Sequence, residues 1–591
     1  MGSAMRRGVL WSVASLAMSK VLGLVAVLVL ARLLAPGEFG TLGAVVAFLA
    51  FLQLGSDLGM QAAVVYEQEE GVSRRVHVAF TVNAGLALVL TLIGVALAGP
   101  IASFFGAPDA AWLFRLGVLN LLIAALANVH DGLLLRDMAF NRRIVPQVGQ
   151  AVAQAAVSIT LAATGAGAES LVIGLLAGTA TWVALLWAMT GFRPRLVFDK
   201  AIARTMIGYG GAAAALEVVA LLSARADTIV VGHVLGAIAL GVYTIAYRLP
   251  ELLISNITWM VAGVAFPALS RRRGNGMNEA TLKLITVLSL YTVPVGTLML
   301  VLADPMIHVL LGDTWRQAAP VLRAVAVTAF VHTLIFPLGD AGKAQGKQWG
   351  MVGLHLIHVP ILYVGMSIAS DSGLSAVAWV GTGAAVVYAA SFVVWARMSL
   401  GIRSSGILFS LLPSIVAGIG AAAGAALGSV VLWNAPPVLE LLLGLVLGLV
   451  GTVLALRLVT PGMLTRTATD LGLDPVVDRV LKRQRATPAL RTAPAVTLSP
   501  AIVPATQQHL AQPEGSFSPA PLAPAVQETV AAPAGPAAAA GPAAPAPAVA
   551  GVTATPDTAD VEDTRSAADI ALDLAAQHFA MNRAYRDRLR R

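Results

Sequence analysis

The chain has 591 residues, of which 57% are hydrophobic and only 12% are charged. Soluble domains usually carry about 25% charged residues, so this composition excludes a water-soluble protein. The absence of cysteine excludes disulfides, cysteine nucleophiles and thiolate metal sites. The formal net charge of +8 is spread over loops and the C-terminal tail, so it does not indicate nucleic-acid binding.

The apolar residues fall into runs of roughly 20 to 30 residues, the length that a helix needs to cross about 30 Å of hydrocarbon. The strict alternation of barrel strands does not occur. We therefore expect an all-α integral membrane protein with about 14 transmembrane helices. The expected spans are 8–34, 41–66, 76–105, 110–135, 143–165, 169–190, 203–235, 238–270, 281–311, 318–341, 349–370, 374–400, 407–432 and 436–459.

Lysine and arginine residues are concentrated in every second loop between the expected spans. The loops on the other side of the membrane contain few of them, and Arg316 is the clearest one there. The positive-inside rule then predicts that both termini of this multi-pass protein lie on the cytoplasmic side of a bacterial inner membrane. All loops between spans are short, which leaves no room for a catalytic domain, so we expect no enzyme. The cation-rich loops carry Arg74, Arg75, Arg142, Arg143, Arg193, Arg195, Lys200, Arg271 to Arg273, Lys343, Lys347, Arg397 and Arg403.

A weak internal repeat indicates two lobes. The two similar segments are ARLLAPGEFGTL at 31–42 and GHVLGAIALGVY at 232–243. We therefore expect spans 1–6 and spans 7–12 to be parallel repeats that enclose a central site. A Pro- and Ala-rich composition follows the last span and is typical of disorder. The predicted organisation is an N-lobe at 1–200, a C-lobe at 201–402, two further helices at 403–464, a disordered cytoplasmic tail at 465–562 and a candidate short amphipathic helix at 563–591.

Ionisable side chains inside the spans are candidates for function, because burying them in lipid is costly. Lys20 and Asp57 lie at comparable depths in the first two spans, so Lys20 either pairs with Asp57 or faces a cavity and receives a phosphate. Asp227 and Arg248 are candidates for a bridge between the seventh and eighth spans. The same two spans also contain Glu217, Arg225 and Glu251.

Cations of this kind suit an anionic ligand, since arginine offers a planar fork of donors to pyrophosphate and lysine a compact charge. The candidate substrate-binding residues are Lys20, Arg248 and Arg225, and the candidate coupling or ion-pair carboxylates are Asp57, Glu217 and Asp227. Phosphate loops, nucleophile elbows and metalloprotease motifs do not occur in a suitable context, so we expect no catalytic residue, metal or cofactor.

Other polar residues in the spans are assigned structural roles. Asp131 and Asp340 lie near the cytoplasmic ends of their helices and are expected to be solvated or to cap them. His332, His355 and His358 have no accompanying carboxylate, which favours packed neutral histidines over a metal site.

Several segments resemble a known family. They are ARLLAPGEFG at 31–40, LLRDMAFNRR at 134–143, ADTIVVGHVLGAIALGVYTIAYRL at 226–249, VAFPALSR at 264–271 and LADPMIHVLLGDTWRQAAPVLR at 302–323. Together they are similar to the Wzx-type polysaccharide or oligosaccharide flippases of the multidrug/oligosaccharidyl-lipid/polysaccharide (MOP) exporter superfamily. The resemblance implies two lobes of six helices plus two C-terminal helices. It also implies alternating-access transport of undecaprenyl-pyrophosphate-linked oligosaccharide to the outer leaflet for cell-surface polysaccharide biosynthesis.

The related lipid II flippases add a residue-level resemblance. SKVLG at 19–23 looks like their first-helix motif, whose cavity cation matches Lys20, and YRLPELL at 247–253 looks like their eighth-helix segment, whose arginine matches Arg248. A further first-helix arginine of that branch is replaced here by Ala26, which disfavours lipid II as the substrate.

The alternatives are a lipid II flippase and a cation-coupled multidrug exporter of the same fold. An exporter of organic cations favours an acidic cavity and a carrier of lipid pyrophosphates a basic one. The implied partners are the lipid-linked oligosaccharide and membrane lipids, with a polysaccharide polymerase or glycosyltransferases as candidate partners of the cytoplasmic tail.

Overall fold

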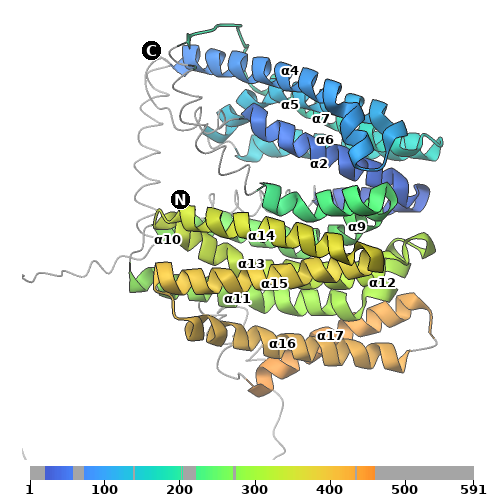
Figure 1. Ribbon diagram of the computed structural model, residues 1–591, viewed down its shortest axis with the longest axis vertical. Helices are drawn as coiled ribbons and strands as arrows, with labels where there is room; N and C mark the ends of the chain where they lie inside the picture. The colour runs from blue at the N-terminus through green and yellow to red at the C-terminus, as the bar shows by residue number, and fades with distance from the viewer. Residues whose placement is uncertain are drawn as a thin grey trace, which may run out of the picture. The chain divides into compact units, whose positions relative to one another are not determined.

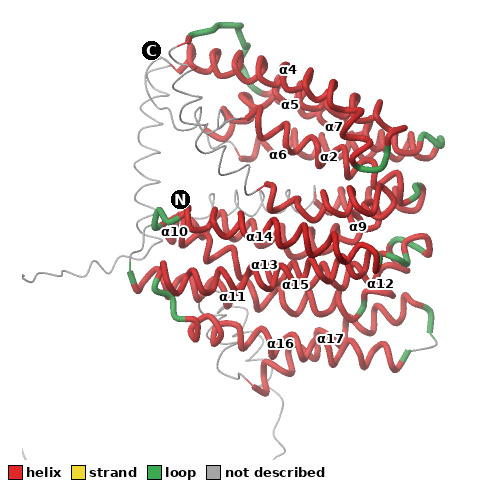
Figure 2. Tube along the Cα trace, viewed as in Figure 1, coloured by secondary structure: helices red, strands yellow, loops and turns green. Residues whose placement is uncertain are grey.

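The computed structural model describes residues 20–57, 72–136, 140–200, 203, 221–270, 274–432 and 435–459. Within these ranges all regular elements are helices and no strand occurs (Figure 2). All described residues belong to the first of the two units into which the chain divides, residues 1–491. The predicted disordered tail and the predicted amphipathic helix lie outside the described residues.

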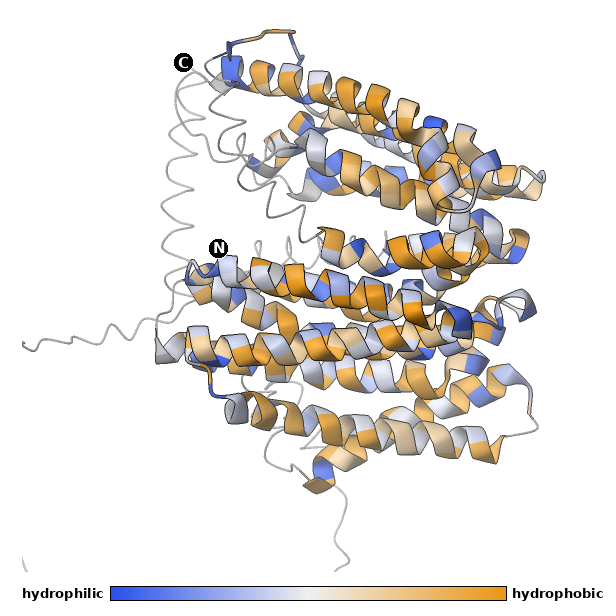
Figure 3. Cartoon of the chain, viewed as in Figure 1, coloured by the Kyte–Doolittle hydropathy of each residue, from blue (hydrophilic) through white to orange (hydrophobic). Residues whose placement is uncertain are grey.

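The helices have the length and composition of membrane spans. Twelve candidate spans occur in the described part of the chain, and apolar residues run along their lengths (Figure 3). One candidate, Leu221–Val261, joins the end of the seventh expected span to the eighth, and residues 20–33 are helical where the first span is expected. The prediction of a multi-pass helical membrane protein is therefore confirmed, and the described helices are consistent with about fourteen spans.

Helices from the first part of the chain pack together as an N bundle (Figure 1). In this bundle α6 packs along α7, and α4 packs along α5. A short 3-10 turn, η1 (Pro108–Ala110), joins α4 to α5. The members of the N bundle are α2 (Pro36–Asp57), α4 (Val72–Phe104), α5 (Ala111–Arg136), α6 (Phe140–Ala163) and α7 (Gly167–Met189).

A second set of helices forms the C bundle, in which α13 contacts α9, α10, α11, α14 and α15. Two π-helical turns, η2 (Val231–Leu235) and η3 (Glu251–Ser255), interrupt its first long helical stretch. The other members are α9 (Gly236–Pro250), α10 (Asn256–Ser270), α11 (Asn275–Val301), α12 (Ala303–Leu310), η4 (Asp313–Trp315), α13 (Ala318–Ala344), α14 (Gln348–Ala369), η5 (Ser370–Ser372) and α15 (Leu374–Leu400).

The last two described helices, α16 (Ser404–Val431) and α17 (Pro437–Val459), pack on each other and on α11. Their contact is made by glycines, which let the two backbones approach closely, as small residues do between helices in lipid. A Cβ at Gly424 would overlap the carbonyl of Leu447. The glycines of this contact are Gly420, Gly424 and Gly428 on α16 and Gly444, Gly448 and Gly451 on α17.

We expect Gly424→Leu to destabilise the α16–α17 pair by about 1–3 kcal/mol, because overpacking a tight contact forces the backbones apart. The measurement is the melting temperature of the purified protein, which should fall by several degrees. Gly353→Leu on α14 is the matched control, because a Cβ there meets no atom. Equal melting temperatures for the two variants would contradict the close contact.

Candidate functional site

A cavity of about 1780 Å³ is lined by residues of both bundles. It exceeds the roughly 300–1,000 Å³ of a site for a drug-sized ligand. Along the first helix its lining extends from Lys20 to Leu30, or roughly 15 Å. The cavity is therefore long enough to hold an extended polar group within the membrane-spanning region.

Cationic side chains from distant parts of the sequence meet in this cavity. Lys20, Arg225, Arg248 and Lys343 all line it, and all four are exposed. Arg248 Nη1 lies 3.1 Å from the carboxylate of Glu251, and each of these side chains is 43% exposed. In the described part of the chain, no carboxylate lies within ion-pair distance of Lys20 or Arg225. The cations thus present charge to the cavity, and their role in binding a substrate stays a prediction.

Asp227 lines the same cavity but has different partners from those expected. Tyr243 Oη donates a 2.8 Å hydrogen bond to one oxygen, and the backbone amide of Thr228 donates to the other at 2.7 Å. The expected bridge between Asp227 and Arg248 is wrong, because Arg248 pairs with Glu251. The reason is geometric: Arg248 lies roughly 7.5 Å further along the helix than Tyr243, which holds the Asp227 carboxylate.

Asp57 and Glu217 are the other two candidate carboxylates. Asp57 is the last residue of α2, but its side chain lies outside the described set, and Glu217 lies outside the described residues altogether. The proposed pairing of Lys20 with Asp57 stays a prediction.

Asp131 does not behave as a solvated or capping residue. Its side chain is buried and both of its oxygens accept 2.6 Å hydrogen bonds from the guanidinium of Arg143. This bidentate pair joins α5 to α6, so it is a structural contact of the N bundle.

Histidines form an aromatic cluster on the C-bundle side of the cavity. Tyr388 Oη lies 2.7 Å from His355 Nδ1, and the ring of His358 stacks on Tyr388 with centroids 4.3 Å apart. These residues and His332 line the cavity, a position that the sequence analysis missed. Among the described residues, no group of three His, Cys, Asp or Glu side chains is placed to hold a metal. The predicted packed histidines are therefore also part of the cavity wall.

The cavity ends at a close crossing of α2 and α9, next to its lining residue Phe39. A Cβ at Gly40 would overlap the carbonyl of Ala237, and a Cβ at Gly241 would overlap that of Pro36. The contact is reciprocal, since the internal repeat aligns Gly40 with Gly241 and Pro36 with Ala237. Only glycine permits this approach of two helices, so the bundles are sealed together here.

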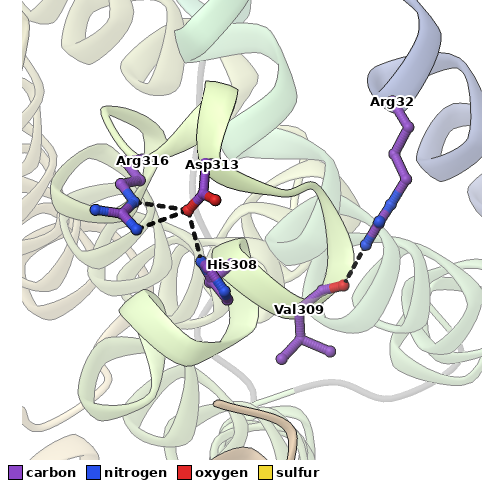
Figure 4. Close-up of polar contacts among 5 residues, drawn as sticks. All are labelled: Arg32, His308, Val309, Asp313 and Arg316. Carbon is purple, nitrogen blue, oxygen red and sulfur yellow. Dashed lines mark hydrogen bonds and ion pairs between the residues drawn. The ribbon is translucent and has the colours of Figure 1, made fainter. Parts of the chain in front are cut away.

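Aligned polar residues reinforce this closed end. Arg32 Nη2 donates a 2.7 Å hydrogen bond to the carbonyl of Val309 in the last turn of α12 (Figure 4). His233, which the repeat aligns with Arg32, places Nδ1 3.0 Å from the carbonyl of Phe104, the last residue of α4. Arg32 therefore reaches the C-terminal end of α12, and His233 reaches that of α4, where the carbonyl groups attract donors and positive charge.

Trp315 adds a large aromatic contact at the same end. It is fully buried, and its Nε1 donates a 2.6 Å hydrogen bond to the carbonyl of Ala31. Its ring meets Phe39 edge to face with centroids 5.4 Å apart. The η4 turn of the C bundle is thereby fixed to the first helix and to α2.

An exposed ion cluster lies beside Trp315, between α12 and α13 (Figure 4). Arg316 Nη2 lies 2.7 Å from Asp313 Oδ1, and His308 Nδ1 lies 2.9 Å from the same oxygen. The hydrogen bond from Arg316 is the main reason why the pKa of Asp313 lies below its ordinary value.

These helices, with a polar cavity between two bundles closed at one end, define a membrane protein of transporter type. Solved structures share the fold. An inward closed structure of the lipid II flippase MurJ matches with a TM-score of 0.61 at 14% identity, covering 76% of this chain and 99% of that one. An inward-facing multidrug resistance MATE family transporter of the MOP superfamily matches with a TM-score of 0.51 at 17% identity, covering 67% and 99%.

Sequence relatives point to polysaccharide biosynthesis. The succinoglycan biosynthesis transport protein ExoT of Rhizobium meliloti is 29% identical over 333 residues, 55% of this chain and 66% of that protein. The teichuronic acid biosynthesis protein TuaB of Bacillus subtilis is 23% identical over 56% of this chain and 69% of its own. The lipopolysaccharide biosynthesis protein WzxC of Escherichia coli is 22% identical over 58% and 70%. The aligned region thus spans about two thirds of each relative.

Residues 29–320 match the polysaccharide biosynthesis protein family. The matched region is just under half of the chain, and it makes the chain similar to this family, while the fold is that of the solved MurJ and MATE structures. The resemblance to Wzx-type flippases and the expectation of a transporter in place of an enzyme are confirmed by these relatives.

Proposed function

We propose that this protein moves an undecaprenyl-pyrophosphate-linked oligosaccharide from the cytoplasmic to the outer leaflet of a bacterial inner membrane, for cell-surface polysaccharide biosynthesis. The matching family and the relatives in succinoglycan, teichuronic acid and lipopolysaccharide biosynthesis support a lipid-linked sugar as the cargo. Both termini lie in the cytoplasm, residues 1–200 and 201–402 act as the two lobes, and the cargo crosses by alternating access between them.

The observation that carries the proposal is the gathering of Lys20, Arg225 and Arg248 in one large cavity. A pyrophosphate entering it meets donors with full positive charge in a region from which water is partly excluded, where such hydrogen bonds are strong. The ion pair between Arg248 and Glu251 is half exposed. Pairs of this kind are worth about 0–1 kcal/mol, so Arg248 can exchange Glu251 for a phosphate at little cost.

The carboxylates that the sequence singles out are the candidates for coupling transport to a cation. Asp227 lines the cavity and lies close enough to Arg225 to feel its charge. In the proposal Asp57, Glu217 and Asp227 either bind a coupling cation or balance the cavity cations after the phosphate has left.

Two related functions are less well supported. Ala26, which stands where the lipid II flippase branch has an arginine, is a lining residue of the cavity. The cavity therefore lacks a positive charge at that point, which disfavours lipid II. A carrier of organic cations is disfavoured because the cations of the lining (Lys20, Arg225, Arg248 and Lys343) outnumber its carboxylates (Asp227, Glu251 and Asp340).

The test replaces Lys20 and Arg248 by alanine, singly and together. A charged hydrogen bond is worth about 1.5–3 kcal/mol, so each single variant should lower export by roughly tenfold to a hundredfold, and the double variant should approach background. Surface polysaccharide and the lipid-linked intermediate in the cytoplasmic leaflet are measured in cells. The control is Lys283→Ala, which removes an exposed lysine of α11 that is not a cavity residue. Normal export by a correctly inserted double variant would refute the proposal.

A further inference from the structure

One wall of the cavity is polar without being charged. Asn120 and Asn128 on α5 and Gln150 and Gln154 on α6 all line it. We call these four side chains the amide wall. Between residues 36 and 190, no described residue that lines the cavity is charged. The charged lining residues lie elsewhere: Lys20 is on the first helix, and Arg225, Asp227, Arg248, Glu251, Asp340 and Lys343 all lie beyond residue 220. The part of the lining that α5 and α6 form is therefore chemically different from the rest.

The two glutamines share one face of α6, since residues four apart lie one helical turn above each other. Their stems pack against α7 at Gly178: a Cβ there would lie 2.8 Å from the Cβ of Gln154 and 3.5 Å from the Cγ of Gln150. This close helix contact fixes where the side chains leave α6, and the amide groups line the cavity.

The amide wall is short of hydrogen-bond partners. Asn120 is only 5% exposed, yet its Oδ1 accepts no hydrogen bond in the described part of the protein. Asn128, Gln150 and Gln154 likewise make no side-chain hydrogen bond with described residues. Buried amides are normally paired, and unpaired ones are costly inside a membrane. Asn120 is buried without a partner for its oxygen, and Asn128, Gln150 and Gln154 are partly exposed on the cavity wall, so the hydrogen-bonding groups of all four are open to a ligand in the cavity.

The chemistry of the wall selects neutral hydroxyl-rich groups. Each amide offers two donors and one acceptor oxygen, which complements the adjacent hydroxyl groups of a sugar, each of them donor and acceptor. Trp182 of α7 lines the same side of the cavity and supplies a flat apolar surface for the C–H face of a sugar ring. An ionised phosphate can accept hydrogen bonds from the amide N–H groups but has no donor for the amide oxygens, so a hydroxyl group complements the wall more fully.

We propose that the amide wall is the glycan subsite of the transporter and that the cavity cations Lys20, Arg225 and Arg248 hold the pyrophosphate. This assignment rests on the proposed function. It orients the cargo in the cavity, with its sugars against α5 and α6 and its phosphates toward Lys20, Arg225 and Arg248. Residues of the amide wall are then the ones that discriminate between glycans.

The test measures binding of two probes to the full-length protein in lipid nanodiscs. One probe is lipid-linked oligosaccharide purified from cells that lack the protein, and the other is undecaprenyl pyrophosphate without sugar. In the Gln150→Leu/Gln154→Leu variant we expect affinity for the first probe to fall at least about tenfold and affinity for the second to stay unchanged. Gln147→Leu, on the same helix but not lining the cavity, is the matched control.

The outcomes separate the subsite from the proposed function. Unchanged binding of the oligosaccharide probe by the double variant would overturn the subsite, as would an equal loss for both probes. Wild-type protein that binds both probes equally tightly would also overturn it and leave the proposed function standing. Wild-type protein that binds neither probe would refute the proposed function itself. Unaltered binding of undecaprenyl pyrophosphate by the variant demonstrates that it is folded.

Discussion

Gly241→Ala is expected to reduce transport to background, although the change adds a single methyl group. The added Cβ would overlap the carbonyl of Pro36, a backbone atom that cannot move aside as a side-chain end does. The same holds for Gly40→Ala and the carbonyl of Ala237. Either variant forces α2 and α9 apart and prevents this end of the cavity from closing, a step that every alternating-access cycle requires.

The control is a glycine replacement that is expected to leave transport intact. Gly85 lies in α4 with open space around its Cβ position, so Gly85→Ala should preserve transport. It should also stabilise the helix by about 0.5–1 kcal/mol, because alanine is the better helix former. Comparing Gly85→Ala with Gly241→Ala shows whether a loss of transport comes from the α2–α9 contact or from replacing any glycine in a membrane helix.

The chain contains no cysteine, so a single introduced thiol reports on closure. Leu30 lines the cavity beside the crossing and is 5% exposed. In the Leu30→Cys protein we expect little labelling by a membrane-impermeant maleimide from the side of the α2–α9 contact. Adding Gly241→Ala should make the thiol reactive. Full transport by Gly241→Ala, with the thiol still protected, would mean that the glycine contact does not govern closure.

Trp315→Ala should destabilise the protein by about 3–5 kcal/mol, the typical cost of removing a fully buried large aromatic side chain. The loss includes the contact with Phe39 and the hydrogen bond to Ala31, both of which fix the η4 turn to other elements. Because these contacts join the C bundle to the first helix and α2, we also expect the closed end to open.

Trp315→Phe separates the two contributions. Phenylalanine keeps most of the buried aromatic surface but cannot donate to the carbonyl of Ala31, so the expected cost is about 1 kcal/mol. The free energy of unfolding in detergent, followed by denaturant titration, compares the two variants. If the alanine and phenylalanine variants were equally stable, the packing of Trp315 would not be the main contribution.

The helical architecture follows directly from the sequence, because run length and loop charge dictate where membrane helices form. The partner of Asp227 could not be predicted from the sequence in the same way. The expected depths of Asp227 and Arg248 assume regular helices, whereas residues 231–235 form a π-helical turn. A turn of this kind shifts the register, and a hydropathy pattern carries no sign of it.

The cavity cations were predictable because charge stands out within apolar sequence. The amide wall was not, since Gln150 and Gln154 are neutral and only their spacing on one face of α6 distinguishes them. The reciprocal contact of Gly40 with Gly241 was present in the sequence as one of two identities in a weak repeat. Its meaning required the crossing of α2 and α9, which depends on the packing of residues far apart in the chain.

The most direct test of the account is translocation by the purified protein in liposomes. A fluorescent undecaprenyl-pyrophosphate-linked oligosaccharide is incorporated in both leaflets, and a membrane-impermeant reagent quenches the outer leaflet. The account predicts that wild-type protein exposes the inner pool and that the Lys20→Ala/Arg248→Ala variant does so no faster than protein-free liposomes. Equal exposure by wild-type protein and that variant, or none by the wild-type protein, would contradict it.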